Sequence, residues 1–237
     1  ALTATAHTEH FDIFSRPGSK SDLHGNRIGA AAEIELARIS RDLEVANDLR
    51  YTLFLFDDAD DLARTTGVRS AGGYSIGQTS CVPFGDTPTR IHEMVHIVAA
   101  AKIGGKPQSY FLIEGLANAL LGPIPGWDVH AVAKYYREAK KLPSLAEMIG
   151  APDFYVWLEK HSDLNAYDIA GSWMRFLIDT QGIAKTKRYY GGEKAESVFG
   201  QSSASLEEAW LATLDAYQPA EEMQMQVALT GGRSSER

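Results

Sequence analysis

The sequence is poor in cysteine and in positive charge. Of its 237 residues only Cys81 is a cysteine, so the chain cannot form an internal disulfide. Lysine and arginine number 23 against 31 aspartate and glutamate residues, which gives a formal net charge of −8. Surfaces that bind nucleic acid or anionic lipid need basic patches. The acidic balance therefore argues against both kinds of partner.

Long apolar runs are also missing. The longest, around residues 97–101, is far shorter than the roughly 20 residues of a membrane-spanning helix, so we expect no membrane span. The chain opens at Ala1 without methionine and without a basic-then-apolar leader. This opening is compatible with a mature end left by signal removal or with trimming. The expectation is a soluble protein whose oligomeric state is left open.

The apolar pattern predicts an α+β fold with strands first and helices later. Strands are expected at 11–14 and 51–56, and one or two strands within 71–83. Helices are expected at 21–43, 58–66, 91–101, 111–121 and 166–180. We expect a small mixed sheet in an N-terminal lobe at 1–88 and a helical lobe at 89–217. A polar tail is expected at 218–237.

The pentad His92-Glu93-Met94-Val95-His96 is the most informative motif. It lies at the start of an apolar, helix-like run that follows a plausible cap, Asp86, and a proline in the first turn. Residues four apart share a helix face, so His92 and His96 could both bind one Zn²⁺. Glu93 is placed to hold a water on the metal and to take its proton. The alternative is a pair of solvated or core histidines without metal.

Glu114 is the candidate third ligand. It is the one charge in the apolar segment 111–121, which we expect to be a buried helix. A buried carboxylate is costly unless it is paired or bound to a metal. The alternative is a glutamate favoured by the dipole at the N-terminus of its helix. Cys81, in contrast, is expected to be a small core residue and not a nucleophile.

These residues resemble the gluzincin metallopeptidases, the group that includes thermolysin and the aminopeptidase N relatives. The resemblance lies in the pentad, in Glu114-Gly115-Leu116-Ala117, and in the stretch Tyr167-Asp168-Ile169-Ala170-Gly171-Ser172-Trp173. It covers roughly residues 71–190, and Glu114 follows His96 by 18 positions, about one fewer than is usual in the group. No metzincin-type third histidine follows His96 at 97–104.

The resemblance implies roles for further residues. It implies one zinc per chain and a two-lobed zincin fold with the active-site helix between the lobes. An edge strand at Gly73, Tyr74 and Ser75 would bind an extended peptide by strand addition. The alternative for these residues is an ordinary hairpin with a glycine turn.

Two supporting roles are expected from the helical lobe. Asn118, one turn after Glu114, could accept from the first zinc-bound histidine, or could satisfy the local backbone instead. Tyr167 is the candidate donor to the developing oxyanion, with His161, Tyr155 and Tyr74 as rivals and packing as the alternative role.

The predicted function is zinc-dependent hydrolysis of peptide bonds, with Glu93 as the general base. An endopeptidase is favoured, because residues 71–77 contain no acid that could hold a free substrate amine as in aminopeptidase N relatives. Secretion or a periplasmic location is compatible with the resemblance. The alternative is a non-catalytic peptide-binding protein on the same fold with a structural or vestigial zinc.

Overall fold

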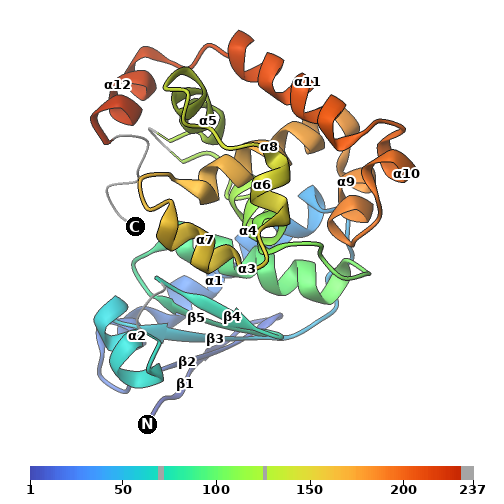
Figure 1. The fold of residues 1–237 in the computed structure, drawn as a ribbon. Helices are drawn as coiled ribbons and strands as arrows, with labels where there is room; N and C mark the ends of the chain where they lie inside the picture. The colour runs from blue at the N-terminus through green and yellow to red at the C-terminus, as the bar shows by residue number, and fades with distance from the viewer. Residues whose placement is uncertain (69–71, 125–126, 231–237) are drawn as a thin grey trace. The chain divides into compact units, whose positions relative to one another are not determined.

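The structure is a computed structural model that describes residues 1–68, 72–124 and 127–230 (Figure 1). It is mixed α+β, with one small mixed sheet and many helices, as the apolar pattern predicts. The backbone divides into two compact units, Ala1–Ile103 and Gly104–Arg237. We expected the first lobe to end at residue 88, whereas the first unit includes the helix α3, Thr87–Lys102. None of the described helices is both long enough and apolar enough to cross a membrane.

The first unit contains a five-stranded sheet with the order β1-β2-β3-β5-β4. The strands are β1 (Thr3–His7), β2 (Phe11–Ser15), β3 (Tyr51–Phe56), β4 (Tyr74–Ile76) and β5 (Thr79–Pro83). The three central strands are parallel, and β1 and β4 pair antiparallel at the two edges. Two helices connect the parallel strands: α1 (Lys20–Asp42) joins β2 to β3, and α2 (Ala59–Thr66) precedes β4 and β5.

The two faces of the sheet are covered by different helices, because successive side chains of a strand point to opposite faces. Ile13 lies in β2 beside Leu53 of β3. A Cβ added to Gly29 of α1 would lie 2.9 Å from Cδ1 of Ile13. This face therefore packs against α1. On the opposite face, Phe56 and Cys81 form a buried cluster with Leu62 of α2. The sheet is thus buried on both sides.

Helix α3 begins where the sequence predicts. The carboxylate of Asp86 accepts a hydrogen bond of 2.9 Å from the backbone N–H of Thr89, and Pro88 lies in the first turn. The helix is tied to α1 by Arg90, which is 3% exposed and makes two hydrogen bonds to Glu35, of 2.6 and 3.0 Å. This buried bidentate pair fixes α3 on the same side as α1 within the first unit.

The second unit is helical throughout its described residues, apart from one isolated bridge. Its helices are α4 (Tyr110–Ala119), α5 (Val129–Glu138), α6 (Leu145–Gly150), α7 (Phe154–Lys160), α8 (Ala166–Gln181), α9 (Ile183–Tyr190), α10 (Ala195–Phe199), α11 (Ser203–Ala216) and α12 (Glu221–Thr230). The segment expected as a polar tail thus contains α12, and residues 231–237 lie outside the described part.

Helices α4 and α8 pack closely because glycine stands at two crossing points. A Cβ on Gly115 of α4 would lie 2.6 Å from the carbonyl oxygen of Ala170 in α8. A Cβ on Gly171 of α8 would lie 2.8 Å from the Cβ of Asn118. Distances below 3.0 Å exclude a side chain at both positions. The α4–α8 crossing therefore sets the position of the functional candidates on α4.

Candidate metal centre

The two histidines of the pentad converge on one point. They lie four residues apart in α3, and their Nε2 atoms are 3.0 Å apart, with the rings nearly perpendicular at 87°. Two nitrogens that bind one tetrahedral zinc at about 2.0–2.1 Å lie about 3.4 Å from each other. The separation of His92 and His96 is thus close to that of two ligands of a single ion. The same distance also fits an N–H···N hydrogen bond between neutral rings.

Glu93 lies between the two histidines in the chain and is held by a strand of the sheet. Its side chain is 6% exposed, and its Oε2 accepts a hydrogen bond of 2.7 Å from Oγ of Ser75 in β4. The same hydroxyl lies 3.0 Å from the backbone oxygen of Glu93. A buried carboxylate with a hydroxyl donor is restricted in orientation. This contact was not expected from the sequence.

The other residues expected at the edge strand have different surroundings. Tyr74 packs on the face opposite Ser75, against the cluster that contains Leu62 and Cys81. Burial raises the pKa of the Cys81 thiol, which fits the core role expected for it. A Cβ on Gly73 would lie 2.6 Å from Cγ2 of Thr89, so this glycine permits close approach of the strand to α3.

Glu114 is buried in α4, as its apolar neighbours predict. It is 5% exposed, and its Oε1 accepts a hydrogen bond of 3.2 Å from the hydroxyl of Tyr155 in α7. Burial and the adjacent Glu114 carboxylate raise the pKa of Tyr155, so its phenol keeps its proton. Metal-binding carboxylates are commonly held by such a donor. Tyr155, which the sequence offered only as a rival to Tyr167, is thus a phenol that contacts the candidate ligand.

Asn118 and Asp168 form a buried polar pair inside the second unit. Nδ2 of Asn118 donates to Oδ1 of Asp168 at 2.8 Å. Asp168 is 0% exposed, and its Oδ2 accepts from the indole N–H of Trp127 and from the side chain of Asn165. Because its Nδ2 is directed at Asp168, the amide of Asn118 presents Oδ1 as its acceptor atom. Asp168 was quoted in the sequence motif but given no role; its position inside an apolar helix was the signal that could have found it.

Tyr167 and His161 lie in the second unit with different neighbours. The ring of Tyr167 packs edge-on against Phe154 at 6.1 Å, and its charge in the ionised state contributes to the raised pKa of Tyr155. His161 stacks on Trp157 at 4.1 Å and directs Nδ1 to the carbonyl oxygen of that residue.

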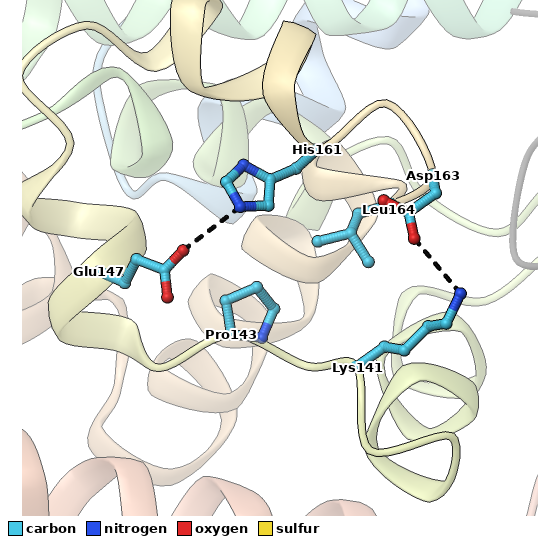
Figure 2. Close-up of a pocket in the computed structure, with 6 residues that line it drawn as sticks. All are labelled: Lys141, Pro143, Glu147, His161, Asp163 and Leu164. Atoms are coloured by element: carbon cyan, nitrogen blue, oxygen red, sulfur yellow. Dashed lines mark hydrogen bonds and ion pairs between the residues drawn. The ribbon is translucent and has the colours of Figure 1, made fainter.

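The second nitrogen of His161 faces a small surface pocket (Figure 2). Its Nε2 lies 3.5 Å from the carboxylate of Glu147. The pocket, of about 280 Å³, is lined on its other side by the ion pair of Lys141 and Asp163. Both ring nitrogens of His161 therefore have partners on α6 and α7.

The structure thus groups the expected residues in two sets. His92, Glu93 and His96 lie together with Ser75 in the first unit. Glu114, Asn118, Tyr155 and Tyr167 belong to the second unit and lie on α4, α7 and α8. The first set contains two imidazole nitrogens and a buried carboxylate, and the second contains a buried carboxylate that accepts a hydrogen bond from a phenol.

Two of the solved structures similar to this chain are M1 zinc metallopeptidases. One is a mutant of a two-domain M1 zinc metallopeptidase bound to L-tryptophan, with a TM-score of 0.46 and 16% identity over 99% of this chain. The other is a mutant M1 zinc metallopeptidase from Deinococcus radiodurans bound to a Tyr-Ser-Ala substrate, with a TM-score of 0.45 and 15% identity over 100% of this chain. The chain spans about half the length of each, 51% and 52%. At these TM-scores the likeness supports no conclusion about activity. No protein-family model and no curated protein matches the sequence.

Proposed function

We propose that this chain is a zinc-dependent metallopeptidase that cleaves internal peptide bonds. The observation that carries the proposal is the convergence of the two imidazoles of α3, with Nε2 atoms 3.0 Å apart, beside a buried carboxylate that is not needed for binding the metal. A structural zinc site needs ligands only. A carboxylate held next to the two ligands by its own hydrogen bond is what hydrolysis requires in addition.

The donor set fits zinc. We propose His92, His96 and Glu114 as the ligands, the two histidines of the pentad and the buried carboxylate of α4. Two imidazole nitrogens and one carboxylate leave a fourth tetrahedral position open, which is the pattern of catalytic zinc and not of closed structural sites. The hydrogen bond from Tyr155 to Glu114 supplies the outer support that a ligating carboxylate usually has.

The proposed mechanism assigns each step to residues of the chain. A bound zinc ion would supply Lewis-acid polarisation of the scissile carbonyl and a lower pKa of water. Glu93 takes the proton of the attacking water and delivers it to the leaving amine. A phenol from the second unit, Tyr167 or Tyr155, donates to the oxygen that becomes negative during the attack. Asn118 would accept the second N–H of His92 and so fix the ring orientation.

The substrate would bind along β4. This strand lies at the edge of the sheet and pairs only with β5 within the described residues. An extended peptide can add to such an edge through backbone hydrogen bonds, without a requirement for particular side chains. Ile76, at the end of the strand, is 72% exposed and offers an apolar contact to the incoming chain.

A peptide-library cleavage profile, with and without a chelator, tests the proposal. We expect cleavage within peptides, loss of cleavage in the chelator and recovery on addition of zinc. Metal analysis should give about one zinc per chain, and His92→Ala or His96→Ala should lose most of it. Full zinc retention in either variant would contradict the proposed site.

The same experiment addresses the alternative of a non-catalytic peptide-binding protein. Such a protein would bind the library peptides and zinc but would release every peptide intact. Binding without cleavage, at full zinc content, would make that alternative the better description.

A further inference from the structure

The hydroxyl of Ser75 has one proton and three acceptors near it. Oε2 of Glu93 lies at 2.7 Å, the backbone oxygen of Glu93 at 3.0 Å and Oγ of Ser80 at 3.4 Å. The carboxylate oxygen is both the closest and the only charged acceptor, and charge-assisted hydrogen bonds are the shorter and stronger ones. The hydroxyl of Ser75 therefore donates its hydrogen bond to Oε2 of Glu93, and the hydroxyl of Ser80 can donate to Oγ of Ser75.

The backbone of Ser75 points the other way, to the open edge of the sheet. Ile76 and Thr79 flank a two-residue turn, residues 77–78, whose first residue is a glycine with φ of 59°. In such hairpins the flanking pair is hydrogen bonded and the next pair, here Ser75 and Ser80, is not. The N–H and C=O of Ser75 are therefore turned away from β5. A peptide that adds to β4 would pair with these two groups.

We infer that Ser75 is a positioning residue that couples binding of the peptide to the orientation of Glu93, an inference that rests on the proposed peptidase function. Its backbone binds the substrate strand, and its hydroxyl holds one carboxylate oxygen of the base. A peptide that pairs with residue 75 restricts the movement of β4 and so the position of the Ser75 hydroxyl. The hydroxyl then holds the Glu93 carboxylate in the orientation needed for proton transfer. The other carboxylate oxygen of Glu93, Oε1, is then the atom that takes the proton from the attacking water.

The coupling predicts an unusual dependence on substrate length. In the unmodified chain, extending a peptide so that it pairs with β4 should raise kcat as well as lower KM, because remote binding energy improves the reacting geometry. In Ser75→Ala the backbone groups remain but the hydroxyl is lost. The variant should lose about tenfold in kcat on long peptides, the effect of one hydrogen bond to a charged group. Extension should then change KM alone.

Two further variants make the comparison specific. Ser75→Thr keeps a hydroxyl at the same position and should restore most of the lost kcat. Ser80→Ala removes a buried hydroxyl from the paired position on β5 but leaves the hydrogen bond from Ser75 to Glu93 in place, so kcat should be nearly unchanged. A kcat loss in Ser80→Ala as large as that in Ser75→Ala would indicate general disturbance of the sheet and would overturn the inference.

A measurement without turnover tests the contact itself. The free energy of unfolding in chelator is measured for Ser75→Ala, for Glu93→Ala, which removes the acceptor, and for the double variant. The hydrogen bond predicts non-additive changes. Additive changes would show that the contact is absent and would overturn the inference. Non-additive changes in the free energy of unfolding, together with a normal kcat in Ser75→Ala, would overturn the positioning role and leave the peptidase proposal standing. Non-additive changes in a protein that binds zinc but cleaves no peptide would overturn the proposed function and, with it, the role given to Ser75.

Discussion

Replacement of Glu114 by glutamine separates a metal ligand from a structural carboxylate. The residue is 5% exposed and accepts a hydrogen bond from Tyr155, which a glutamine oxygen can also accept. Glu114→Gln therefore keeps the shape and the hydrogen bond and removes only the charge. If the charge serves zinc, its loss should weaken zinc binding and should not harm the metal-free protein.

The size of the effect follows from linkage between binding and folding. A ligand at a concentration of 100 times its Kd stabilises the folded chain by about 2.7 kcal/mol. Loss of an outer contact alone weakens metal binding by about 10–100-fold, so a hundredfold increase in Kd is a modest effect for loss of a ligand's charge. At the same zinc concentration this weaker Kd leaves a stabilisation by zinc of about 0.4 kcal/mol. In chelator Glu114→Gln should be as stable as the unmodified chain or more stable, because a buried carboxylate without its metal is costly and an amide is not.

The assay is chemical unfolding at fixed zinc and in chelator, together with a competition titration of zinc against a coloured chelator. The reasoning predicts a large zinc-dependent stabilisation for the unmodified chain and a small one for Glu114→Gln. An equal stabilisation in both, with the variant less stable in chelator, would show that Glu114 is structural. Asp128, the other acid to consider as a ligand, caps α5 and accepts from Tyr217, so it would be the next residue to test.

Four other substitutions test separate parts of the account. Tyr167→Phe should lower kcat and kcat/KM together by about 10²–10³-fold with KM unchanged, whereas Tyr155→Phe should weaken zinc binding about 10–100-fold in a competition titration. Glu35→Gln breaks the buried pair with Arg90, whose Nη1 already has no hydrogen-bond partner among the described residues, and should cost about 3 kcal/mol in urea unfolding. Gly115→Ala places a methyl group 2.6 Å from a backbone oxygen of α8 and should cost about 1–3 kcal/mol, read as a lower Tm.

Local signals in the sequence predicted much of the first unit and the start of the site. The cap Asp86 and the proline after it predicted where α3 begins, and the apolar residues around Glu114 predicted its burial. Both signals are properties of neighbouring residues, which helix propensity and capping describe well. The strand β1, Thr3–His7, was missed, because its alternation of threonine and alanine has no large apolar side chain to reveal it.

Contacts between distant residues were not visible in the sequence. Ser75 reaches Glu93 only because the short turn after β4 sets the register with β5 and because α3 covers that face of the sheet. Tyr155 reaches Glu114 across 41 positions of the chain, through the packing of α7 beside α4. Periodicity assigns a residue to a face of its own element; it does not say which element lies opposite. The helix α12 was missed for a related reason, since its polar composition resembles that of a tail.

The most direct test of the central claim is the turnover of Glu93→Gln at matched zinc content. Glu93 is proposed to move protons and not to bind metal, so the variant should hold about one zinc per chain and should unfold like the unmodified chain. Its kcat on a cleaved library peptide should fall by about 10²–10⁴-fold, the usual contribution of general acid–base catalysis. Full activity in the zinc-loaded variant would contradict the account, because the carboxylate between the two histidines would then have no part in hydrolysis.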